Sequence, residues 1–404
     1  MRGIKIITFF LIIISNSTIA QIQLGQSLYG ESGGDTFGNS VSINGDGTII
    51  AVGAVHSNKG GYESGIVKVY GYRKDEWAQI GNDIFVNDIK KMGYEVCLNS
   101  KGNIVAIGAP TSNRQNGAVC VFKNIDGKWV HVGNEIIGDT LATHNGRSIS
   151  LNSEGNIIAI GAKIFTDGYT ANGLVRTFKF ENDKWIQIGK TIESSQSDDN
   201  FGASVCLNSL GNILAIGANK SNYNKGHVSI FKLESNNWIK YGENIIGESN
   251  GDMFGNAISL DSSGDIIAVG APYNHGNSIE SGHVRVFIKT SIDWQQIGSD
   301  INGDFKSDYF GGSVSLNSVG SIVCVGAKFY DKNGDNSGLV RIFKFQNESW
   351  IPYGGDIMGE QPKDLLGNSV GLSSDGKEIV IGAYWNKKNG MYTGQVKVFK
   401  LDVE

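Results

Sequence analysis

Aspartates recur at one position of this sequence, three residues before a glycine that opens a strand-like segment. They are Asp35, Asp199, Asp252, Asp308 and Asp364. Carboxylates gathered on one face of a molecule could bind a cation or a polar ligand. An aspartate at the start of a turn also accepts backbone N–H groups and so caps that turn. We expect turn capping, because a structural role repeats in most copies of a unit, and ligand binding is the alternative.

A second acidic run, DKNGDNSG, places Asp331, Asn333 and Asp335 at alternate positions. Alternating oxygen ligands are typical of calcium loops. The run lacks the distal glutamate that completes a helix-loop-helix calcium site. We keep these three residues as a candidate metal site and predict no other metal or cofactor.

Aromatic residues fall in the variable loops expected between the second and third strands of the repeated unit. They are Phe165, Tyr223, Tyr273, Tyr330, Tyr384 and Trp385. Loops that project from a regular scaffold commonly carry specificity. We predict that these six side chains contact a ligand, although exposed aromatic residues also occur without function.

No catalytic constellation emerges from the sequence. The six histidines show no metal-ligand spacing and no Ser/His/Asp order, and no glycine-rich phosphate loop precedes a helix. We therefore expect a binding protein and no enzyme. One alternative is a carbohydrate-active hydrolase that uses a carboxylate pair in a central channel. Another is a passive module that positions partner domains.

The elements that position these residues belong to a repeat of about 53 to 56 residues. An anchor glycine opens the first strand of each copy, at Gly38, Gly93, Gly146, Gly202, Gly255, Gly311 and Gly367. A Gly-Ala pair closes the second strand, with its glycine at Gly53, Gly108, Gly161, Gly217, Gly270, Gly326 and Gly382. A tryptophan starts the fourth strand in six copies, at Trp77, Trp129, Trp185, Trp238, Trp294 and Trp350.

Each copy is predicted to form four antiparallel strands. SVSLNS alternates small polar and apolar residues, whereas IIAIGA is almost continuously apolar and must be covered on both faces. Turns such as LNSEGN join these two strands as tight hairpins. Face-to-face stacking of such sheets around an axis covers both faces. The sequence therefore predicts an all-β, seven-bladed β-propeller.

The last copy ends at QVKVFKLDVE without a tryptophan segment, and QIQLGQSLYGES near the N-terminus resembles the missing piece. We predict one propeller domain over residues 21–404. In it, the N-terminal strand at 21–30 completes the last blade, formed by about 362–404, and Gln21 takes the tryptophan position.

Residues 1–20 have a basic start, a short apolar run and a small-residue end, which is typical of a secretory signal peptide cleaved after Ala20. No other segment is long and apolar enough to span a membrane. The net charge is −5 without a basic cluster, which argues against nucleic acid as a partner. We expect a monomer, secreted or at the cell surface, with an extracellular protein or glycan as its ligand.

Four cysteines in an exported protein could form disulfides. Only Cys97 and Cys120 share a repeat, and an intervening strand would hold their Cα atoms about 9–10 Å apart, beyond the reach of a disulfide. We predict free thiols that are mostly buried.

The segment FGNSVSINGDGTIIAVGA (37–54) and its counterparts at 201–218 and 254–271 resemble the FG-GAP repeat family. That family includes the seven-bladed head of integrin α subunits and some propeller lectins. The resemblance implies extracellular adhesion or ligand binding without enzymatic activity. The family often binds calcium between the first and second strands, but loops such as NSKGN and NSLGN lack the carboxylates. Met92, Asn145 and Leu366 also replace the phenylalanine in three copies.

Overall fold

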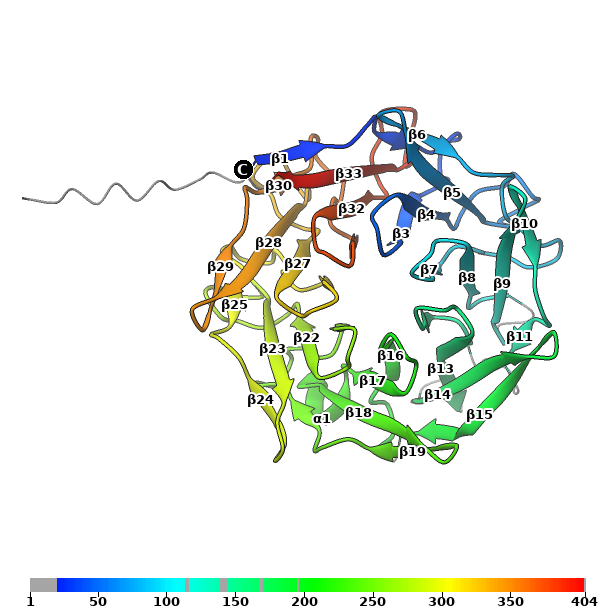
Figure 1. Ribbon diagram of the computed structural model, residues 1–404. Helices are drawn as coiled ribbons and strands as arrows, with labels where there is room; N and C mark the ends of the chain where they lie inside the picture. The colour runs from blue at the N-terminus through cyan, green and yellow to red at the C-terminus, as the bar shows by residue number, and fades with distance from the viewer. Residues whose placement is uncertain (1–19, 113–115, 139–143, 167–169, 195, 403–404) are drawn as a thin grey trace, which may run out of the picture.

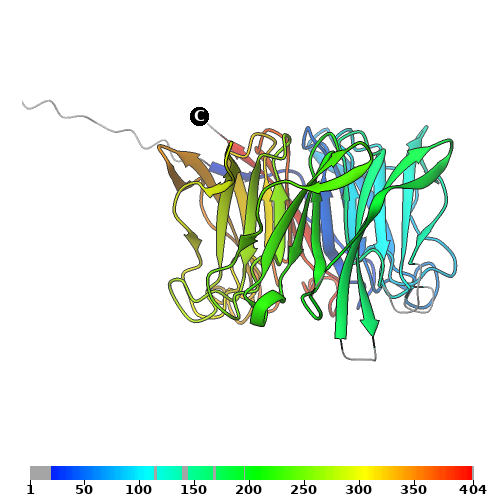
Figure 2. The ribbon, with the colours of Figure 1, turned by 90° about the horizontal axis from the view of Figure 1, so that it is seen from below.

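The computed structural model describes residues 20–112, 116–138, 144–166, 170–194 and 196–402. They form seven antiparallel sheets, which surround a central axis as blades (Figure 1). The predicted all-β, seven-bladed propeller is confirmed. The only helical segment among the described residues is the four-residue turn α1 (Ser221–Asn224). In the side view the long strands β13 and β14 project beyond the other blades, on the face that also carries α1 (Figure 2).

The first three blades follow the chain from the axis outward. Blade 1 contains β3 (Phe37–Ile43), β4 (Ile49–Ala54), β5 (Ile66–Arg73) and β6 (Glu76–Gln79). Blade 2 contains β7 (Glu95–Leu98), β8 (Ile104–Ala109), β9 (Ala118–Ile125), β10 (Lys128–His131) and the short β11 (Ile136–Ile137). Blade 3 contains β12 (Ser148–Leu151), β13 (Ile157–Thr166), β14 (Thr170–Glu181) and β15 (Lys184–Glu193).

Blades 4 to 6 each add a short outer strand. Blade 4 contains β16 (Phe201–Leu207), β17 (Ile213–Ala218), β18 (His227–Glu234), β19 (Asn237–Lys240) and β20 (Ile245–Ile246). Blade 5 contains β21 (Ala257–Leu260), β22 (Ile266–Ala271), β23 (His283–Lys289), β24 (Trp294–Gln296) and β25 (Ile301–Asn302). Blade 6 contains β26 (Ser313–Leu316), β27 (Ile322–Ala327), β28 (Leu339–Gln346), β29 (Ser349–Pro352) and β30 (Ile357–Met358).

Blade 7 combines the two ends of the described chain. It contains β31 (Ser369–Leu372), β32 (Glu378–Ala383) and β33 (Gln395–Asp402), with β1 (Ala20–Gln23) and β2 (Leu28–Tyr29). β33 pairs with β32 along one edge and with β1 and β2 along the other. Residues near the start and the end of the sequence thus share one sheet.

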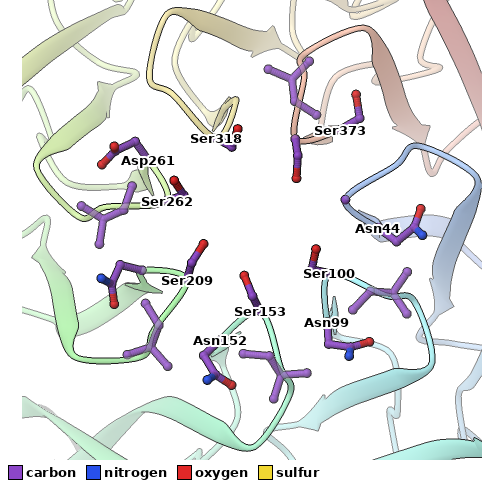
Figure 3. Close-up of a pocket in the computed structure, with 18 of the residues that line it drawn as sticks. Asn44, Asn99, Ser100, Asn152, Ser153, Ser209, Asp261, Ser262, Ser318 and Ser373 are labelled. Atoms are coloured by element: carbon purple, nitrogen blue, oxygen red, sulfur yellow. The ribbon is translucent and has the colours of Figure 1, made fainter.

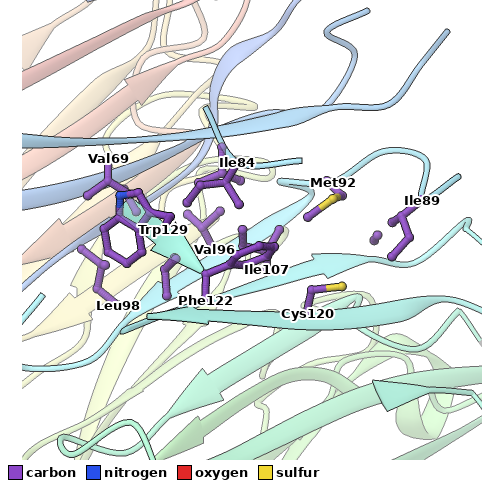
Figure 4. Packing of buried hydrophobic residues seen from close by; sticks show 14 of the residues in the cluster. Val69, Ile84, Ile89, Met92, Val96, Leu98, Ile107, Cys120, Phe122 and Trp129 are labelled. Atoms are coloured by element: carbon purple, nitrogen blue, oxygen red, sulfur yellow. The ribbon is translucent and has the colours of Figure 1, made fainter. Parts of the chain in front are cut away.

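The apolar second strands fill the spaces between blades. Ile50 and Val52 of β4 are fully buried, as expected for a strand covered on both faces. Between blades 1 and 2, Val69 packs in one cluster with Val96, Leu98, Ile107 and Trp129 (Figure 4). Because burying one large aliphatic side chain stabilises a fold by roughly 1.5–3 kcal/mol, these clusters are the main attraction between neighbouring blades.

Neighbouring blades approach most closely at the two repeated glycines. A Cβ placed on Gly53 would lie 2.1 Å from the carbonyl oxygen of Gly93 in the next blade. The equivalent contact from Gly382 of blade 7 to Gly38 of blade 1 is also 2.1 Å. The anchor glycines adopt positive φ as well, for example 88° at Gly38 and 84° at Gly93. Side chains are therefore excluded from both positions, which explains why these glycines recur in the sequence.

A ring of backbone hydrogen bonds encircles the axis at the turns between first and second strands. The turn residue of each blade donates its N–H to the carbonyl of the turn in the next blade, at 2.8–3.2 Å. We call this the turn ring, and its members are Gly45, Ser100, Ser153, Ser209, Ser262, Ser318 and Ser374. The bond from Ser374 to the Gly45 carbonyl, at 2.8 Å, returns the ring to blade 1.

The repeated tryptophans link the outer strands of adjacent blades. The indole N–H of Trp129 donates to the Ile80 carbonyl at 2.9 Å, and that of Trp350 donates to the Ile297 carbonyl at 3.0 Å. Each ring packs over a glycine of the preceding blade: a Cβ on Gly298 would lie 2.7 Å from Trp350 Cδ1. Between blades 6 and 7, a Cβ on Gly354 of blade 6 would lie 2.7 Å from Gln21 Nε2 of blade 7. Gln21 therefore occupies the position that tryptophan takes in the other blades.

All four cysteines are free, as predicted, with Cys120 and Cys324 buried and Cys97 and Cys206 partly buried. The sulfur of Cys97 accepts the Leu151 N–H at 3.3 Å, and that of Cys206 accepts the Leu260 N–H at 3.3 Å. Serine hydroxyls make the same contact between other blades, for example from Ser150 to Leu207. The two thiols therefore replace serines as acceptors between blades.

The predicted signal peptide lies outside the described residues, apart from Ala20. Within the part of the chain that the structure describes, no helix is long and apolar enough to cross a membrane.

Removal of residues 21–30 will destabilise the whole propeller, because β33 loses the strands that cover its outer edge. We expect the melting temperature to fall by roughly 10 °C or more, or folding to fail. Thermal unfolding of chains that start at residue 21 and at residue 31 measures this effect. Equal melting temperatures would contradict the closing role of β1 and β2.

Replacing Gln21 with tryptophan should stabilise blade 7. The Gln21 amide nitrogen is buried without a hydrogen-bond partner among the described residues. An indole there would reach the carbonyl before Gly354, as five of the six repeated tryptophans reach the equivalent carbonyl, so we expect a rise of roughly 1–3 °C in melting temperature. Ile22→Trp on the same strand is the control, because Ile22 is 49% exposed. A Gln21→Trp chain no more stable than this control would refute the assignment.

Candidate functional site

The axis of the propeller carries one cavity at each end. The smaller, about 180 Å³, is bounded by the turn ring. In Figure 3, Ser100, Ser153 and Ser209 point toward the axis, and Asn99 and Asn152 lie behind them. The larger cavity, about 460 Å³, opens at the other end between the starts of the first strands. We call the larger cavity the channel mouth.

The turns around the smaller cavity are built as hairpins and leave no carboxylate cage. Asn152 Oδ1 accepts the backbone N–H groups of Asn156 and Ile157 at 3.0 and 2.9 Å. Asp261, the most acidic case, accepts the N–H groups of Gly264, Asp265 and Ile266 with one oxygen, each at 2.9 Å. These side-chain oxygens therefore hold the turns. The loops also lack the carboxylates of the calcium-binding FG-GAP loops, as their sequences indicate.

One residue per blade reaches the channel mouth from the position after the anchor glycine. These residues are Asn39, Tyr94, Arg147, Ala203, Asn256, Gly312 and Asn368. The next position is serine or alanine in six blades and Glu95 in blade 2. Serine hydroxyls here bond across blades, as Ser204 does to the Gly255 carbonyl at 2.8 Å. Comparing the copies at this position would have revealed Glu95, which the sequence analysis missed.

Glu95 is the only carboxylic acid among the described residues that line the channel mouth. Burial desolvates the carboxylate and raises its pKa to about 8, although the residue keeps part of its surface exposed, and a hydrogen bond from Ser40 acts in the opposite direction. The side chain is therefore mostly protonated at neutral pH. A protonated acid can donate a hydrogen bond to a ligand oxygen.

Amide groups connect the blades around this mouth. Lys328 Nζ donates to Asn368 Oδ1 at 3.1 Å, and Asn368 Nδ2 donates to the Asn39 carbonyl at 3.0 Å. Asn39 Nδ2 in turn donates to the Tyr94 carbonyl at 3.0 Å. Burial lowers the pKa of Lys328. The chain of bonds fixes polar side chains of blades 6, 7 and 1 before any ligand arrives.

The predicted aromatic contacts divide into separate groups. Tyr384 lines the channel mouth, and Trp385 packs between Tyr384 and Tyr392 at ring distances of 5.7 and 5.1 Å. Tyr273 stacks on Tyr309 at 4.5 Å. Tyr309 also contacts Phe329 at a ring distance of 5.0 Å, which adds two rings to the six predicted residues.

The other three predicted aromatic residues do not join these groups. Tyr223 is 82% exposed at the α1 turn, and no ring contact is found for it among the described residues. Tyr330 is only 2% exposed and lies against Phe305, which is 57% exposed, so Phe305 forms the outer surface of that loop. The side chain of Phe165 lies outside the described residues.

The recurring aspartates are buried and accept backbone N–H groups. Asp35 Oδ2 accepts those of Glu31 and Ser32 at 3.1 and 2.8 Å. Asp364 Oδ2 accepts those of Glu360 and Gln361 at 3.1 and 3.0 Å. Asp199, Asp252 and Asp308 accept one backbone N–H each, at 2.8–3.2 Å. Burial raises the pKa of Asp308 to about 6. These are the contacts of turn caps.

The alternating run at 331–335 directs its side chains to different partners. Asp331 Oδ1 accepts the Asn336 N–H at 2.7 Å, and Asn333 donates to the Gly359 carbonyl at 2.9 Å. Asp335 accepts from the Asn336 side chain at 3.0 Å. A different group of ligating residues lies close together: Glu248, His283 and Asp300. The histidines show no metal-ligand spacing along the sequence, so the sequence alone did not single out His283.

Changing Glu95 to glutamine will flatten the pH dependence of stability between pH 5 and 8. The folded protein keeps the proton on Glu95 up to about pH 8, whereas the unfolded chain releases it above about pH 4.5. The free energy of unfolding of the parent therefore falls as pH rises through this window, by at most about 1.4 kcal/mol per unit from this group. Denaturant unfolding at four pH values measures it. Glu154→Gln, at an exposed position, is the control; parallel profiles for parent and Glu95→Gln would exclude the shift.

Comparison with known proteins supports the architecture. The FG-GAP repeat family model matches residues 30–70. No curated protein sequence matches. A hydrazine synthase chain of Kuenenia stuttgartiensis aligns with a TM-score of 0.60 and 13% identity, covering 94% of this chain and 99% of that one. A candidate 6-phosphogluconolactonase of Bacteroides uniformis ATCC 8492 aligns with a TM-score of 0.57 and 11% identity, covering 86% of this chain and 98% of that one. Both likenesses show the fold alone. The chain is a seven-bladed β-propeller in which residues 30–70 match the FG-GAP repeat model.

Proposed function

We propose that this protein is a non-catalytic binding propeller that acts outside the cell and takes a hydroxyl-rich ligand, a glycan or a polar protein surface, at the channel mouth. The observation that carries this proposal is the lining of that cavity. It combines amides and hydroxyls with the rings of Tyr94 and Tyr384, and with the charged groups Arg147 and Lys328. Amides and hydroxyls exchange hydrogen bonds with sugar hydroxyls or peptide groups, and aromatic faces pack on their C–H surfaces.

The fixed geometry of the mouth favours binding. Lys328, Asn368 and Asn39 hold one another by hydrogen bonds, so little side-chain entropy remains to be lost when a ligand docks. The extracellular setting rests on the signal-like residues 1–20 and on the FG-GAP repeat. The proposed role in adhesion rests on the resemblance of the repeats to the FG-GAP family.

Hydrolysis is the second candidate, because Glu95 carries a proton near neutral pH as a general acid must. Glycoside hydrolysis uses two carboxyl groups about 5–10 Å apart. Glu95 has no second carboxyl group beside it among the described residues of the mouth, and this favours binding.

Screening of the purified chain on glycan and matrix-protein arrays tests the proposal. We expect a ligand whose affinity falls at least about tenfold in Tyr384→Ala and in Asn368→Ala, since each removes a contact worth about 1.4 kcal/mol or more. Tyr223→Ala is the control, because this exposed side chain does not line the channel mouth. Absence of any ligand, or equal affinity in Tyr384→Ala, would contradict the proposal. Turnover of a bound glycan that stops in Glu95→Gln would instead establish the hydrolase.

A further inference from the structure

A group of metal-ligating side chains lies at the junction of blades 4 and 5, away from the channel mouth. Glu248 belongs to the loop between β20 and β21, His283 begins β23, and Asp300 directly precedes β25. One donor atom from each residue lies within 4.8 Å of the other two. Three residues that span 52 positions of the sequence, from Glu248 to Asp300, thus lie close together in the fold.

His283 is buried without a hydrogen bond. Its side chain is 1% exposed, and neither ring nitrogen has a hydrogen-bond partner among the described residues. Nδ1 lies 3.9 Å from Glu248 Oε2 and 3.7 Å from Asp300 Oδ2, too far for hydrogen bonds. Buried polar nitrogens are normally satisfied, so this imidazole requires a partner that protein atoms do not supply.

Unpartnered oxygens accompany this imidazole. Asn302 pairs with His283 across the β23–β25 ladder, and its Oδ1 is buried without a hydrogen-bond partner among the described residues. The same holds for Oδ1 of Asp252, whose charge acts on the imidazole. Several polar atoms around one histidine therefore lack partners at the same place.

Blade 6 supplies an internal comparison. There Arg341 binds the two equivalent carboxylates directly, with Asp304 at 2.5 Å and Asp356 at 2.7 Å. The position of His283 is occupied by Leu339. All three polar side chains of blade 6 satisfy one another, and no imidazole is present.

Blade 5 departs from this arrangement. Arg285 donates Nε and Nη2 to Gln296 Oε1 at 2.9 and 2.7 Å. Its guanidinium stands 3.8 Å from Glu248 and 3.5 Å from Asp300. The arginine thus stands farther from both carboxylates than in blade 6, in the one described blade that places a histidine between them, and Asp300 Oδ1 accepts from Gln296 Nε2 at 2.7 Å.

The geometry points to a binding site for a divalent transition-metal ion, formed by Nδ1 of His283 and the carboxylates of Glu248 and Asp300. An imidazole with two carboxylates suits Zn²⁺ or Mn²⁺ and is a poor match for Ca²⁺, which takes oxygen ligands. Two carboxylates balance the charge of the ion, and the exposed side of Glu248 leaves room for water as a further ligand.

The two distances to His283 Nδ1 require only a small adjustment, while the separation of the two carboxylate oxygens is bounded at 4.8 Å. Tetrahedral zinc with bonds near 2.0–2.2 Å places its ligand atoms ~3.4 Å apart. The observed 3.7 and 3.9 Å exceed this by a few tenths of an ångström. Glu248 is 43% exposed and Asp300 28% exposed, so both side chains can close on an ion. Desolvation lowers the pKa of His283, and a metal ligand must be neutral.

Titration of the full-length, chelator-treated protein with Zn²⁺ and separately with Mn²⁺ tests the site. Calorimetry should show one saturable site for at least one of these ions, and the bound ion should raise the melting temperature. His283→Leu should weaken this binding by about 100-fold or more. This variant copies Leu339 of blade 6, so the fold already accommodates leucine at this position.

Two further variants separate this site from surface binding. His227→Leu changes the same repeat position in blade 4, where Asn244 replaces the second carboxylate, and should bind the ion as the parent does. Asp300→Asn should weaken binding at least about tenfold while preserving the fold. The site is excluded if neither ion binds at micromolar concentration, or if His283→Leu binds as tightly as the parent. A His283 imidazole that NMR finds protonated at pH 7, with no metal bound, would show an ion pair instead and overturn the proposal.

Discussion

The contact between glycines of adjacent blades is the constraint on which the rest of this propeller depends. The Gly-Ala glycine of one blade lies so close to the anchor glycine of the next that a Cβ would come within 2.0–2.2 Å of a carbonyl oxygen. Only this approach lets the second strands bury both faces, with Ile50, Val52 and their equivalents fully enclosed. It also brings the turns near enough for the turn ring to form. Hydrophobic attraction between blades and hydrogen bonding around the axis therefore follow from the absence of two side chains per repeat.

Blade 7 meets blade 1 by the contacts that recur at most other junctions between blades. Gly382 approaches Gly38, Ser374 donates to Gly45, and Trp77 donates its indole N–H to Leu24 at 2.9 Å. The third contact differs from its counterparts because Leu24 comes from the N-terminal segment, which also binds Trp77 through both atoms of the Gln26 amide. An incomplete blade would leave a strand edge open to pairing with another chain. Joining the chain ends within one sheet covers that edge without a new type of interaction.

The fold could be predicted from the sequence because each repeated residue has one geometric role. The anchor glycines and the Gly-Ala pairs fix register in all seven copies and the tryptophans do so in six, so copy number and strand order followed. The site could not be predicted in the same way. Tyr330 and Tyr384 occupy similar loops, but Tyr330 is covered by Phe305 whereas Tyr384 lines the mouth. That difference depends on packing between loops of neighbouring blades, which no local pattern encodes. The role of the recurring aspartates was easier to predict, because a turn cap bonds to backbone groups only a few residues away in the sequence.

Repetition itself indicates where function resides in such a scaffold. Seven copies place equivalent residues in nearly equivalent surroundings. A different residue type in one copy therefore changes the chemical groups at that position while the surrounding structure stays the same. Glu95 stands where other copies carry serine or alanine, and its carboxyl group takes on a raised pKa in that position. His283 stands where blades 1 and 6 carry Ile66 and Leu339, and an imidazole there is buried between two carboxylates. Burying the Glu95 carboxyl group and the His283 imidazole costs stability, because both polar groups lose contact with water. The serine, alanine, isoleucine or leucine of other copies would not carry this cost at the same positions. Such a cost is retained where a bound group or ligand offsets it.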